Sequence, residues 1–464
     1  MPSTSSAVAR PAVDADRAAV PHLRRNYTLG IITGGLAGLA QAFLHPELIV
    51  AGLIWALTQS PMLVAGVTII SKAGALAPQL WASTHLEHRP TKMPYFVAVI
   101  LVRAAALAAM VGTLSLLRTG GNGWGLAGFF AAYLAVCVSG GSARVVYLDM
   151  VGRMIPRGRL GTYFGTRTFL GNLLAILAGA VAVQPILQRV ALPTNYLLIV
   201  IVGGAVSLLD MSLFSRCREL PGPSARRRTT LGESLWRGFK WLRTDHNYRM
   251  YLWMRVAFRM NYLGLAFFIP YGTRALDVRG PGGLAVLGGI MVAVMQVSRM
   301  LASIVWGRLA DRRGFRGCFL GAGACFLVAP ALALLAPRLP AVFAVPIPGT
   351  AAVLDLPLAV YLLALLALGV ATQGNIIGGS HFVVSSAPPR RRPSYSAFVN
   401  TVTSPLTLLP MAGAWLAGWV GMASIFALVA AGGLLMMTSA AAMRPPRRPR
   451  TRPVPPSPVP DDTG

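Results

Sequence analysis

Apolar stretches long enough to cross a lipid bilayer recur along most of the chain. A spanning helix needs about 20 predominantly apolar residues, and polar segments separate twelve such stretches. They predict helices over residues 27–45, 59–83, 94–117, 124–150, 161–185, 195–214, 248–272, 283–306, 318–336, 356–379, 396–419 and 424–443. Residues 46–58 are apolar but too short to span, so we expect the outer end of the first helix and a loop there. The pattern predicts an all-α integral membrane protein with twelve transmembrane helices.

The polar segments also predict how the chain is organised. The long segment 215–247 separates six predicted helices within residues 27–214 from six within residues 248–443. Residues 1–26 contain no apolar core of the kind a signal peptide has, and we expect a disordered arm. Residues 444–464 are rich in proline and arginine, a composition that excludes a helix, and form a tail.

The segment between the two halves contains its own helix signal. Thr230 and Glu233 have the spacing of a capping box. Apolar and basic positions then alternate at helical spacing, with Leu231, Leu235, Phe239 and Leu242 opposite Arg237, Lys240 and Arg243. This predicts a short amphipathic helix, and two placements stay open: on the inner leaflet of the membrane, or in solvent as a linker.

Composition excludes several classes of protein. Of the 464 residues, 55% are hydrophobic and 12% are charged, whereas a soluble domain has roughly 25% charged residues. A soluble enzyme, a disordered protein and a disulfide-rich secreted scaffold are therefore excluded. The four cysteines have no metal-ligand spacing, and no G-x-x-x-x-G-K-[ST] loop occurs. We expect no metal, cofactor or ATP site and no enzymatic activity.

The net charge of +28 is distributed unevenly. Of the 42 Lys and Arg residues, 29 lie in one alternating set of inter-helix and terminal segments, and five lie in the other set. Basic residues accumulate on the cytoplasmic side of membrane proteins, so we expect both termini in the cytoplasm. The excess charge predicts contact with an anionic inner leaflet and argues against a nucleic-acid partner.

Two sequence correspondences relate the halves. The segment 156–163 matches 388–395 in proline, arginine, hydroxyl and tyrosine positions at a constant offset of 232. Near offset 223, Leu86–Arg89 corresponds to Leu309–Arg312. Together they indicate two duplicated six-helix units, as in transporters built from parallel repeats.

The most specific motif runs from Gly307 to Gly317. Gly307 would allow close helix approach, and Gly314 would allow a tight reversal. Asp311 can accept hydrogen bonds from helix N-terminal amides and from arginine. The corresponding loop of the first half is degenerate, with His88 at the aspartate position and Glu87 beside it.

This segment resembles the cytoplasmic loop motif of the major facilitator superfamily, G-x-L-a-D-R-x-G-r. The resemblance implies two pseudo-symmetric six-helix bundles in a bacterial cytoplasmic (inner) membrane, and we expect a monomer. It also implies a gating role for the motif, with Gly307, Asp311, Arg312, Gly314 and Arg316 holding the halves together on the cytoplasmic side. We expect Arg144 and Asp149, close along helix 124–150, to pair with each other or with the Asp311 cluster.

Eight basic residues lie within the predicted spans, against only Asp149 and Asp210. A charge near the bilayer centre costs about 2.5–3.5 kcal/mol on insertion scales and needs a cavity or a partner. Lys72, Arg103 and Arg259 are the deepest. This excess of cations predicts an anionic or zwitterionic small-molecule substrate, and the hypothesis requires that Lys72 and Arg259 share one central cavity.

Helix 248–272 lines the central path in the family that the motif resembles. Arg259, with Asn261 and Tyr262, is therefore the first substrate-contact candidate, ahead of Lys72 and then Arg103. Polar residues on other helices of the path add Gln296, Gln373 and Asn375 as candidates, although interhelical hydrogen bonds explain such residues equally well.

Two functions follow from the sequence. The first is secondary active or facilitative transport by alternating access. The alternative is a non-transporting membrane assembly factor or pigment-delivery protein on the same fold. Proton coupling stays open, because no carboxylate is predicted at mid-membrane: Asp149 or a histidine could serve, or transport could proceed as uniport or exchange.

Overall fold

A computed structural model describes residues 22–118, 123–221, 230–276, 283–347, 353–409, 419 and 421–444. The first half of the chain contributes six long helices: α2 (Leu23–Phe43), α4 (Pro61–Leu86), α5 (Met93–Arg118), α6 (Gly123–Met154), α7 (Leu160–Ala178) and α9 (Thr194–Phe214). The second half contributes α11 (His246–Ala275), α12 (Gly283–Arg313), α13 (Phe315–Leu335), α14 (Leu356–Ser386), α15 (Arg392–Val402) and α17 (Met422–Ala442).

Ten helical stretches of the described residues are long and apolar enough to cross a membrane. The predicted seventh and eleventh helices, which begin as α11 and α15, complete the twelve. A pair of two-residue strands, β1 (Val345–Pro346) and β2 (Val353–Leu354), joins α13 to α14 as an antiparallel ladder. The all-α membrane architecture expected from the hydrophobic pattern is confirmed.

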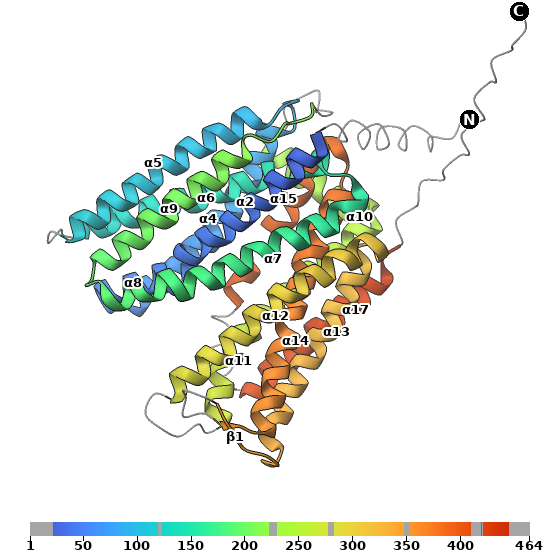
Figure 1. Cartoon of the computed structure of the whole chain (residues 1–464). Helices are drawn as coiled ribbons and strands as arrows, with labels where there is room; N and C mark the ends of the chain where they lie inside the picture. Colours follow the sequence, from blue (N-terminus) through green and yellow to red (C-terminus); the bar gives the residue numbers. More distant parts are fainter. Residues whose placement is uncertain are drawn as a thin grey trace, which may run out of the picture.

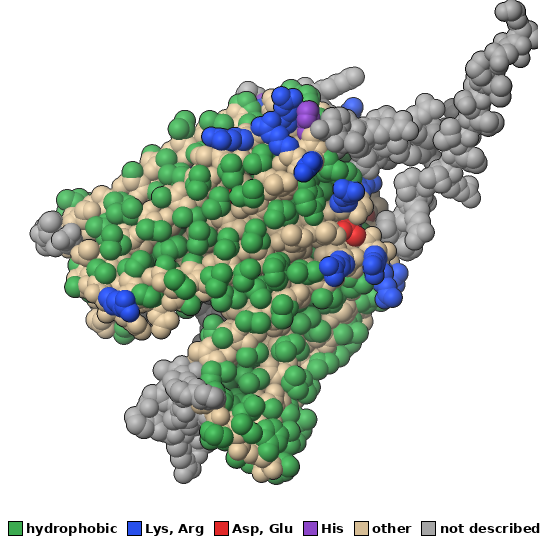
Figure 2. Space-filling model, viewed as in Figure 1, with side chains coloured by type: hydrophobic (Ala, Val, Ile, Leu, Met, Phe, Trp, Pro, Cys, Tyr) green, Lys and Arg blue, Asp and Glu red, His purple; other side chains and the backbone are tan. Residues whose placement is uncertain are grey.

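Figure 1 shows that the first-half helices form one bundle and the second-half helices another. The bundles meet along α7 and α12, and α4 packs against α15 in the same way. Most Lys and Arg side chains in view gather at the end of the molecule where the bundles meet (Figure 2), here called the arginine-rich end.

Two of the predicted segments are wrong in detail. Residues 46–58 are not a loop, because the π-helix η2 (Pro46–Val50) leads directly into α3 (Ala51–Thr58). Pro46 is tolerated there as the first residue of a new helix, where its missing N–H needs no partner. The eleventh helix was expected over 396–419, but α15 ends at Val402 and is followed by the 3₁₀ turn η7 (Pro405–Leu408). Residues 410–418 lie outside the described residues.

Helix bounds elsewhere follow recognisable signals. The fifth helix continues beyond α7 through the π-helix η4 (Gly179–Val183) into α8 (Gln184–Arg189). Asp355 caps α14 by accepting a hydrogen bond from the amide of Leu358 at 2.8 Å. Gly314 separates α12 from α13 with φ +73°, a left-handed conformation that favours glycine.

The internal repeat is visible in local structure. The 3₁₀ turn η3 (Arg157–Arg159) precedes α7, and the 3₁₀ turn η6 (Pro389–Arg391) precedes α15. The matching tyrosines, Tyr163 and Tyr395, are both buried just inside these helices. The two halves therefore share the same helix entry at the positions that the 232-residue offset relates.

The predicted amphipathic helix is α10 (Leu231–Thr244), and its capping box is formed by Thr230 and Glu233. It packs on α4, α11 and α15. Gly238 lies against the ring of Phe398, while Trp236 and Phe239 are exposed. The helix thus contacts both halves at the arginine-rich end, and Gly238 packs against α15 of the second half.

Close backbone contact between α2 and α7 gives a test of this packing. A Cβ atom at Gly38 would fall 2.0 Å from the carbonyl oxygen of Gly171. We predict that Gly38→Val lowers the free energy of unfolding by roughly 1–3 kcal/mol or more, as overpacking does. The measurement is thermal unfolding in detergent. Gly112→Val is the matched control, because nothing lies within 4 Å of its added Cβ. Equal effects of the two substitutions would contradict the packing.

Candidate functional site

The carboxylate of Asp311 joins the two halves at the arginine-rich end. Asp311 lies in the last turn of α12, and its Oδ1 accepts from the amide of Gly161 at 2.6 Å. Its Oδ2 accepts from the amide of Thr162 at 2.7 Å and from the Thr162 hydroxyl at 2.5 Å. These amides belong to the first turn of α7, where the helix dipole favours a negative charge.

Glycines bring α7 and α12 close enough for that contact. An added Cβ at Gly307 would fall 2.6 Å from the carbonyl oxygen of Gly161, and one at Gly165 would fall 2.5 Å from that of Ser303. A side chain at any of these positions would push the helices apart. The expected close approach at Gly307 is therefore found, and its partner is α7 of the other half.

A second contact between the halves involves Asp149 on α6. Its carboxylate pairs with Arg153 at 2.6 Å and, more distantly, with Arg392 at 3.9 Å. Arg392 is the first residue of α15, is buried, and also donates to the backbone carbonyl of Asp149 at 3.3 Å. Sequence reasoning expected the partner of Asp149 to be Arg144 or the Asp311 cluster and missed Arg392.

Neutral groups continue the contact between α4 and α15. The amide of Asn400 donates to Gln79 Oε1 at 2.8 Å, and the hydroxyls of Ser83 and Ser394 lie 3.3 Å apart. All four side chains belong to α4 and α15, which the internal repeat relates to α12 and α7. The arginine-rich end is therefore closed along both inter-bundle seams.

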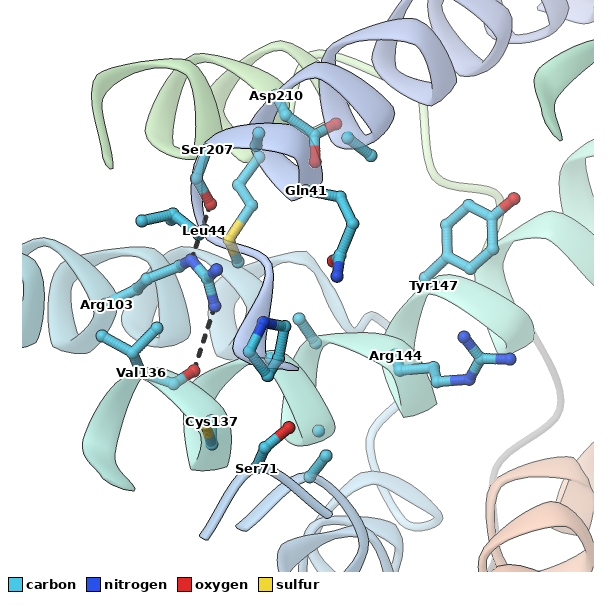
Figure 3. A pocket seen from close by; sticks show the side chains of 18 of the residues that line it. Gln41, Leu44, Ser71, Arg103, Val136, Cys137, Arg144, Tyr147, Ser207 and Asp210 are labelled. Carbon is cyan, nitrogen blue, oxygen red and sulfur yellow. Dashed lines mark hydrogen bonds between the residues drawn. The ribbon is translucent and has the colours of Figure 1, made fainter. Parts of the chain in front are cut away.

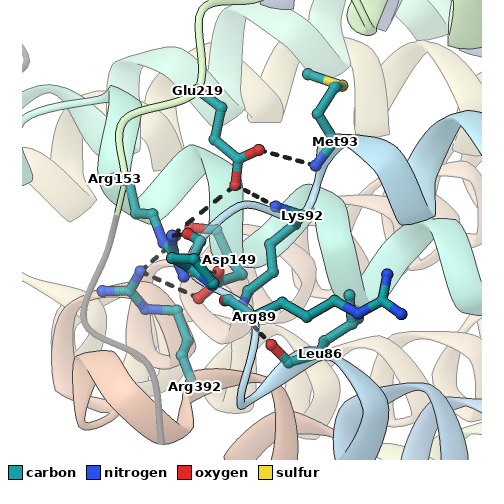
Figure 4. A network of polar contacts seen from close by, with 9 residues as sticks. Leu86, Arg89, Lys92, Met93, Asp149, Arg153, Glu219 and Arg392 are labelled. Atoms are coloured by element: carbon teal, nitrogen blue, oxygen red, sulfur yellow. Dashed lines mark hydrogen bonds and ion pairs between the residues drawn. The ribbon is translucent and has the colours of Figure 1, made fainter.

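Figure 4 shows the polar network beside the Asp149 pair. Glu219 accepts from the amides of Lys92 and Met93 at 2.6 and 2.8 Å, so it caps the start of α5. The Lys92 ammonium is buried and donates to the carbonyls of Leu86 and Arg89. Glu219 thereby ties the segment after α9 to the loop between α4 and α5.

The degenerate loop of the first half makes a different contact from the Asp311 motif. Glu87 pairs with Arg237 of α10 at 3.3 Å. Among the motif arginines, Arg316 donates to the carbonyl of Ala441 at 2.7 Å, a contact within the second half. Asp311 and Gly307 thus contact the other half directly, whereas Arg316 fixes α13 to α17.

A cavity of about 480 Å³ lies inside the first bundle (Figure 3). Its lining comes from α2, η2, α4, α5, α6, α7 and α9. The polar and charged side chains among these residues are Gln41, Ser71, Gln79, Arg103, Tyr133, Arg144, Tyr147, Arg167, Ser207 and Asp210. Three arginines and one carboxylate thus line this cavity, which we call the arginine cavity.

Neutral acceptors hold Arg103 in place. Its Nε donates to the Ser207 hydroxyl at 2.8 Å, and its Nη1 donates to the carbonyl of Val136 at 3.1 Å. These partners lie on α9 and α6, so Arg103 links three helices of the bundle. The hydrogen bonds orient the guanidinium without neutralising its charge.

Arg167 is fixed in a similar manner. Its Nη1 donates to the carbonyl of Gly30 at 2.5 Å and to the Thr33 hydroxyl at 2.8 Å. Its guanidinium carbon lies 4.6 Å from the centroid of the Tyr147 ring, a cation–π distance. Arg144 is exposed and stands one helical turn from Tyr147, at the edge of the same cavity.

Lys72 and Arg259 do not share one central cavity, so the anion hypothesis that required this pair is wrong in that form, and any anion site must rest on other residues. On α4, Ser71 and Ala75 face that cavity, whereas Lys72 faces a separate cavity between α4 and η7. Arg259 is buried on α11 in the second bundle. Consecutive residues on a helix point about 100° apart, and this difference in direction separates Lys72 from the arginines.

The other substrate candidates lie in the second bundle. Asn261 is buried and donates to the carbonyl of Ala257 at 2.9 Å, and the side chain of Tyr262 lies outside the described residues. Asn375 accepts from Arg255 at 3.0 Å, and Gln296 accepts from Arg299 at 2.9 Å. Gln373 is fully buried on α14, with neither side-chain polar atom hydrogen-bonded within the described part of the chain.

Burial of Lys92 generates a pH prediction. Desolvation lowers the pKa of its ammonium from 10.5 to about 8, while the Asp149 carboxylate opposes the shift. The folded state then binds fewer protons than the unfolded state between these two values, so Lys92 makes stability rise with pH across that window. Thermal unfolding should show this rise in the wild type and a smaller one in Lys92→Met. Identical pH profiles would contradict the burial.

Comparison with known proteins identifies the fold. No family model matches the sequence, and no curated protein matches it. A bacterial homologue of the iron transporter ferroportin, in an outward-facing state, has a TM-score of 0.64 and 14% identity over 90% of this chain and 98% of that chain.

Two further solved structures agree with that result. The major facilitator superfamily transporter FucP, in the outward conformation, has a TM-score of 0.65 and 14% identity over 90% of this chain and 98% of that chain. The human organic anion transporter MFSD10 has a TM-score of 0.65 and 15% identity over 90% of this chain and 99% of that chain. The chain therefore has the fold of major facilitator superfamily transporters, with twelve transmembrane helices in two pseudo-symmetric six-helix bundles.

Proposed function

We propose that this protein transports a small anionic solute across a bacterial cytoplasmic membrane by alternating access, with the arginine-rich end in the cytoplasm. The observation that carries the proposal is the arginine cavity, which is lined by three guanidinium groups, two of them held by hydrogen bonds, and by one carboxylate. Its volume of about 480 Å³ suits a small organic molecule.

The electrostatics of the cavity favour an anion. Arg103 and Arg167 are hydrogen-bonded to hydroxyl and carbonyl groups, which orient them but leave their positive charge in place. In a site shielded from bulk water, such charges attract an anion more strongly than they would at a surface. Asp210 supplies a negative charge that a bound anion would compete with.

The contacts between the halves support an outward-facing state. At the arginine-rich end the Asp311 and Arg392 contacts close both seams. At the opposite end the surface is hollowed between the two halves (Figure 2). Release into the cytoplasm would require the α7–α12 and α4–α15 contacts to separate, and reforming them would return the protein to the outward-facing state.

The anion specificity is tested by flux measurements in proteoliposomes. A panel of mono- and dicarboxylates and inorganic phosphate is compared with a panel of organic cations. We expect saturable flux of at least one anion, reduced at least tenfold in Arg103→Gln and partly retained in Arg103→Lys. Asp210→Asn should lower the KM, because it removes the competing negative charge.

Arg189→Gln is the control for those variants, because Arg189 lies in α8, outside the lining of the arginine cavity. Flux confined to cations, or anion flux unchanged in Arg103→Gln, would contradict the proposal. A complete absence of flux from protein that still binds an anion would favour the non-transporting assembly or delivery function.

The Asp311 contact is tested by labelling the native thiol of Cys318. This side chain is fully buried in a cluster that combines residues of both halves, including Leu160 and Ala310. Asp311→Asn removes the charge from hydrogen bonds worth about 1.5–3 kcal/mol each when charged. The comparison uses a protein in which the other three cysteines are replaced. In that background we expect maleimide to label Cys318 at least about tenfold faster in Asp311→Asn than with Asp311 intact. Asp355→Asn, at the opposite end, should leave the rate unchanged; equal rates in all three proteins would exclude this gate.

A further inference from the structure

A groove of about 670 Å³ lies between α10 and the 3₁₀ turn η6 at the arginine-rich end. Residues of α10 form most of its walls, and Arg391 of η6 forms the remaining side (Figure 1 shows α10). We call it the tryptophan groove, because Trp236 and Trp241 both line it. It shares no lining residue with the arginine cavity, so it is a separate site.

The two tryptophans give this groove an aromatic surface. Trp236 is 69% exposed, and the Lys240 ammonium lies 5.7 Å from the centroid of its ring. Trp241 is half-buried, and its ring also contacts Tyr248 and Tyr395. Tryptophan is enriched at protein interfaces, where one large ring contributes much contact area. The groove therefore has the character of a docking surface.

Two cations of the tryptophan groove have no acidic partner in the described part of the chain. Arg237 pairs with Glu87 at 3.3 Å, and Glu233, the one carboxylate of the lining, is used in the capping box of α10. Neither Lys240 nor Arg391 forms an ion pair with any described carboxylate. The groove thus favours a partner that carries negative charge.

The last described residue of the chain lies beside this groove. The amide of Arg444 donates to the side-chain oxygen of Asn247 at 2.9 Å, and its carbonyl accepts from the side-chain nitrogen at 3.1 Å. Asn247 is three residues beyond Thr244, which lines the groove. Pro453 is nine residues after Arg444, a distance of up to about 30 Å. Because α10 is about 21 Å long, the chain from Pro453 onward can reach any part of the groove.

The sequence after Pro453 matches both properties of the tryptophan groove. Five of the eight residues 453–460 are proline, with repeated P-x-x-P spacing, which is typical of ligands for aromatic-lined grooves. Asp461 and Asp462 follow directly and are the only acidic residues of 445–464. Two carboxylates after a proline-rich run thus correspond to two cations beside two tryptophans.

We propose that residues 453–462 dock in the tryptophan groove of the same chain. The prolines pack on the two tryptophans, and the two aspartates pair with Lys240 and Arg391. The docked segment joins α10 to η6, next to the contact between α4 and α15. The proposal does not depend on what the arginine cavity transports.

The tether favours this segment over other anionic occupants. A segment linked to Arg444 by so few residues is present at the groove at an effective concentration on the order of millimolar. The N-terminal residues include Asp14 and Asp16 but no run of prolines. A phospholipid headgroup is anionic as well, but it has no such tether.

The test places photoreactive benzoylphenylalanine at Val459 of the full-length protein in phosphatidylcholine nanodiscs. Cross-linked peptides are identified by mass spectrometry, with isotopically light and heavy protein mixed to distinguish links within a chain from links between copies. We expect links within one chain to 232–244 or 391. Lys240→Glu combined with Arg391→Glu should lower their yield at least tenfold.

Two further comparisons separate charge pairing from damage to the fold. Arg243→Glu combined with Arg390→Glu is the matched control, because both residues are exposed and neither lines the groove; the yield should not change. Replacing both Asp461 and Asp462 by lysine should abolish the links, and adding the two glutamates in the groove should restore at least half of the yield. Trp236→Ala should lower the yield while thermal unfolding stays unchanged.

Five results would overturn the proposal. They are an unchanged yield after the charge reversal in the groove, no recovery after the charge exchange, links only between copies, stronger capture from the same photoreactive residue at Val13, and loss of the links when phosphatidylglycerol replaces half of the phosphatidylcholine. The last two would assign the groove to the N-terminal residues or to lipid headgroups instead.

Discussion

The hydrogen bonds from the first turn of α7 to Asp311 depend on a steric constraint: no side chain may stand between α7 and α12. Gly161, Gly165 and Gly307 satisfy that constraint, and the carboxylate then reaches two backbone amides and a hydroxyl of the other half. The helix dipole stabilises a carboxylate bound at a helix N-terminus, but the interaction consists of only a few contacts. Such a contact can hold one end of the molecule closed and still be broken during a conformational cycle.

The repeat in the sequence explains why closure involves two seams. The α7–α12 seam uses a carboxylate on helix amides, whereas the α4–α15 seam uses Gln79 with Asn400 and the Asp149–Arg392 contact beside it. The first-half loop has His88 at the position of the motif aspartate, and Glu87 beside it contacts α10. The two halves therefore share one architecture, while their two closing contacts use different chemistry.

Much of the fold could be predicted from the sequence because it depends on features that can be counted along the chain. Hydrophobic length sets the helices, arginine placement marks one end, and the Asp311 motif lies where close helix packing requires glycine. Which cavity a side chain faces depends on how its helix packs against the others, and here the predictions failed. Ser71 and Lys72 are neighbours in sequence but face different cavities.

The candidate site illustrates the same limit. The sequence ranks Arg103 below Lys72 and Arg259 as a substrate contact, yet Arg103 lines the cavity with Arg144 and Arg167. Arg392, in a predicted loop, was not considered as a partner of Asp149. A buried acid such as Asp149 indicates that a partner exists, but its identity depends on how α6 and α15 pack.

The central claim is that the two bundles close one end while the other is open. Spin labels at Arg157→Cys and Arg308→Cys report on the arginine-rich end, and labels at Trp124→Cys and Leu335→Cys report on the opposite end. Distances within both pairs are measured by double electron–electron resonance, with and without the transported anion. The account predicts a second population in which the first distance lengthens as the second shortens. Distances that lengthen together, or that never change during turnover, would contradict it.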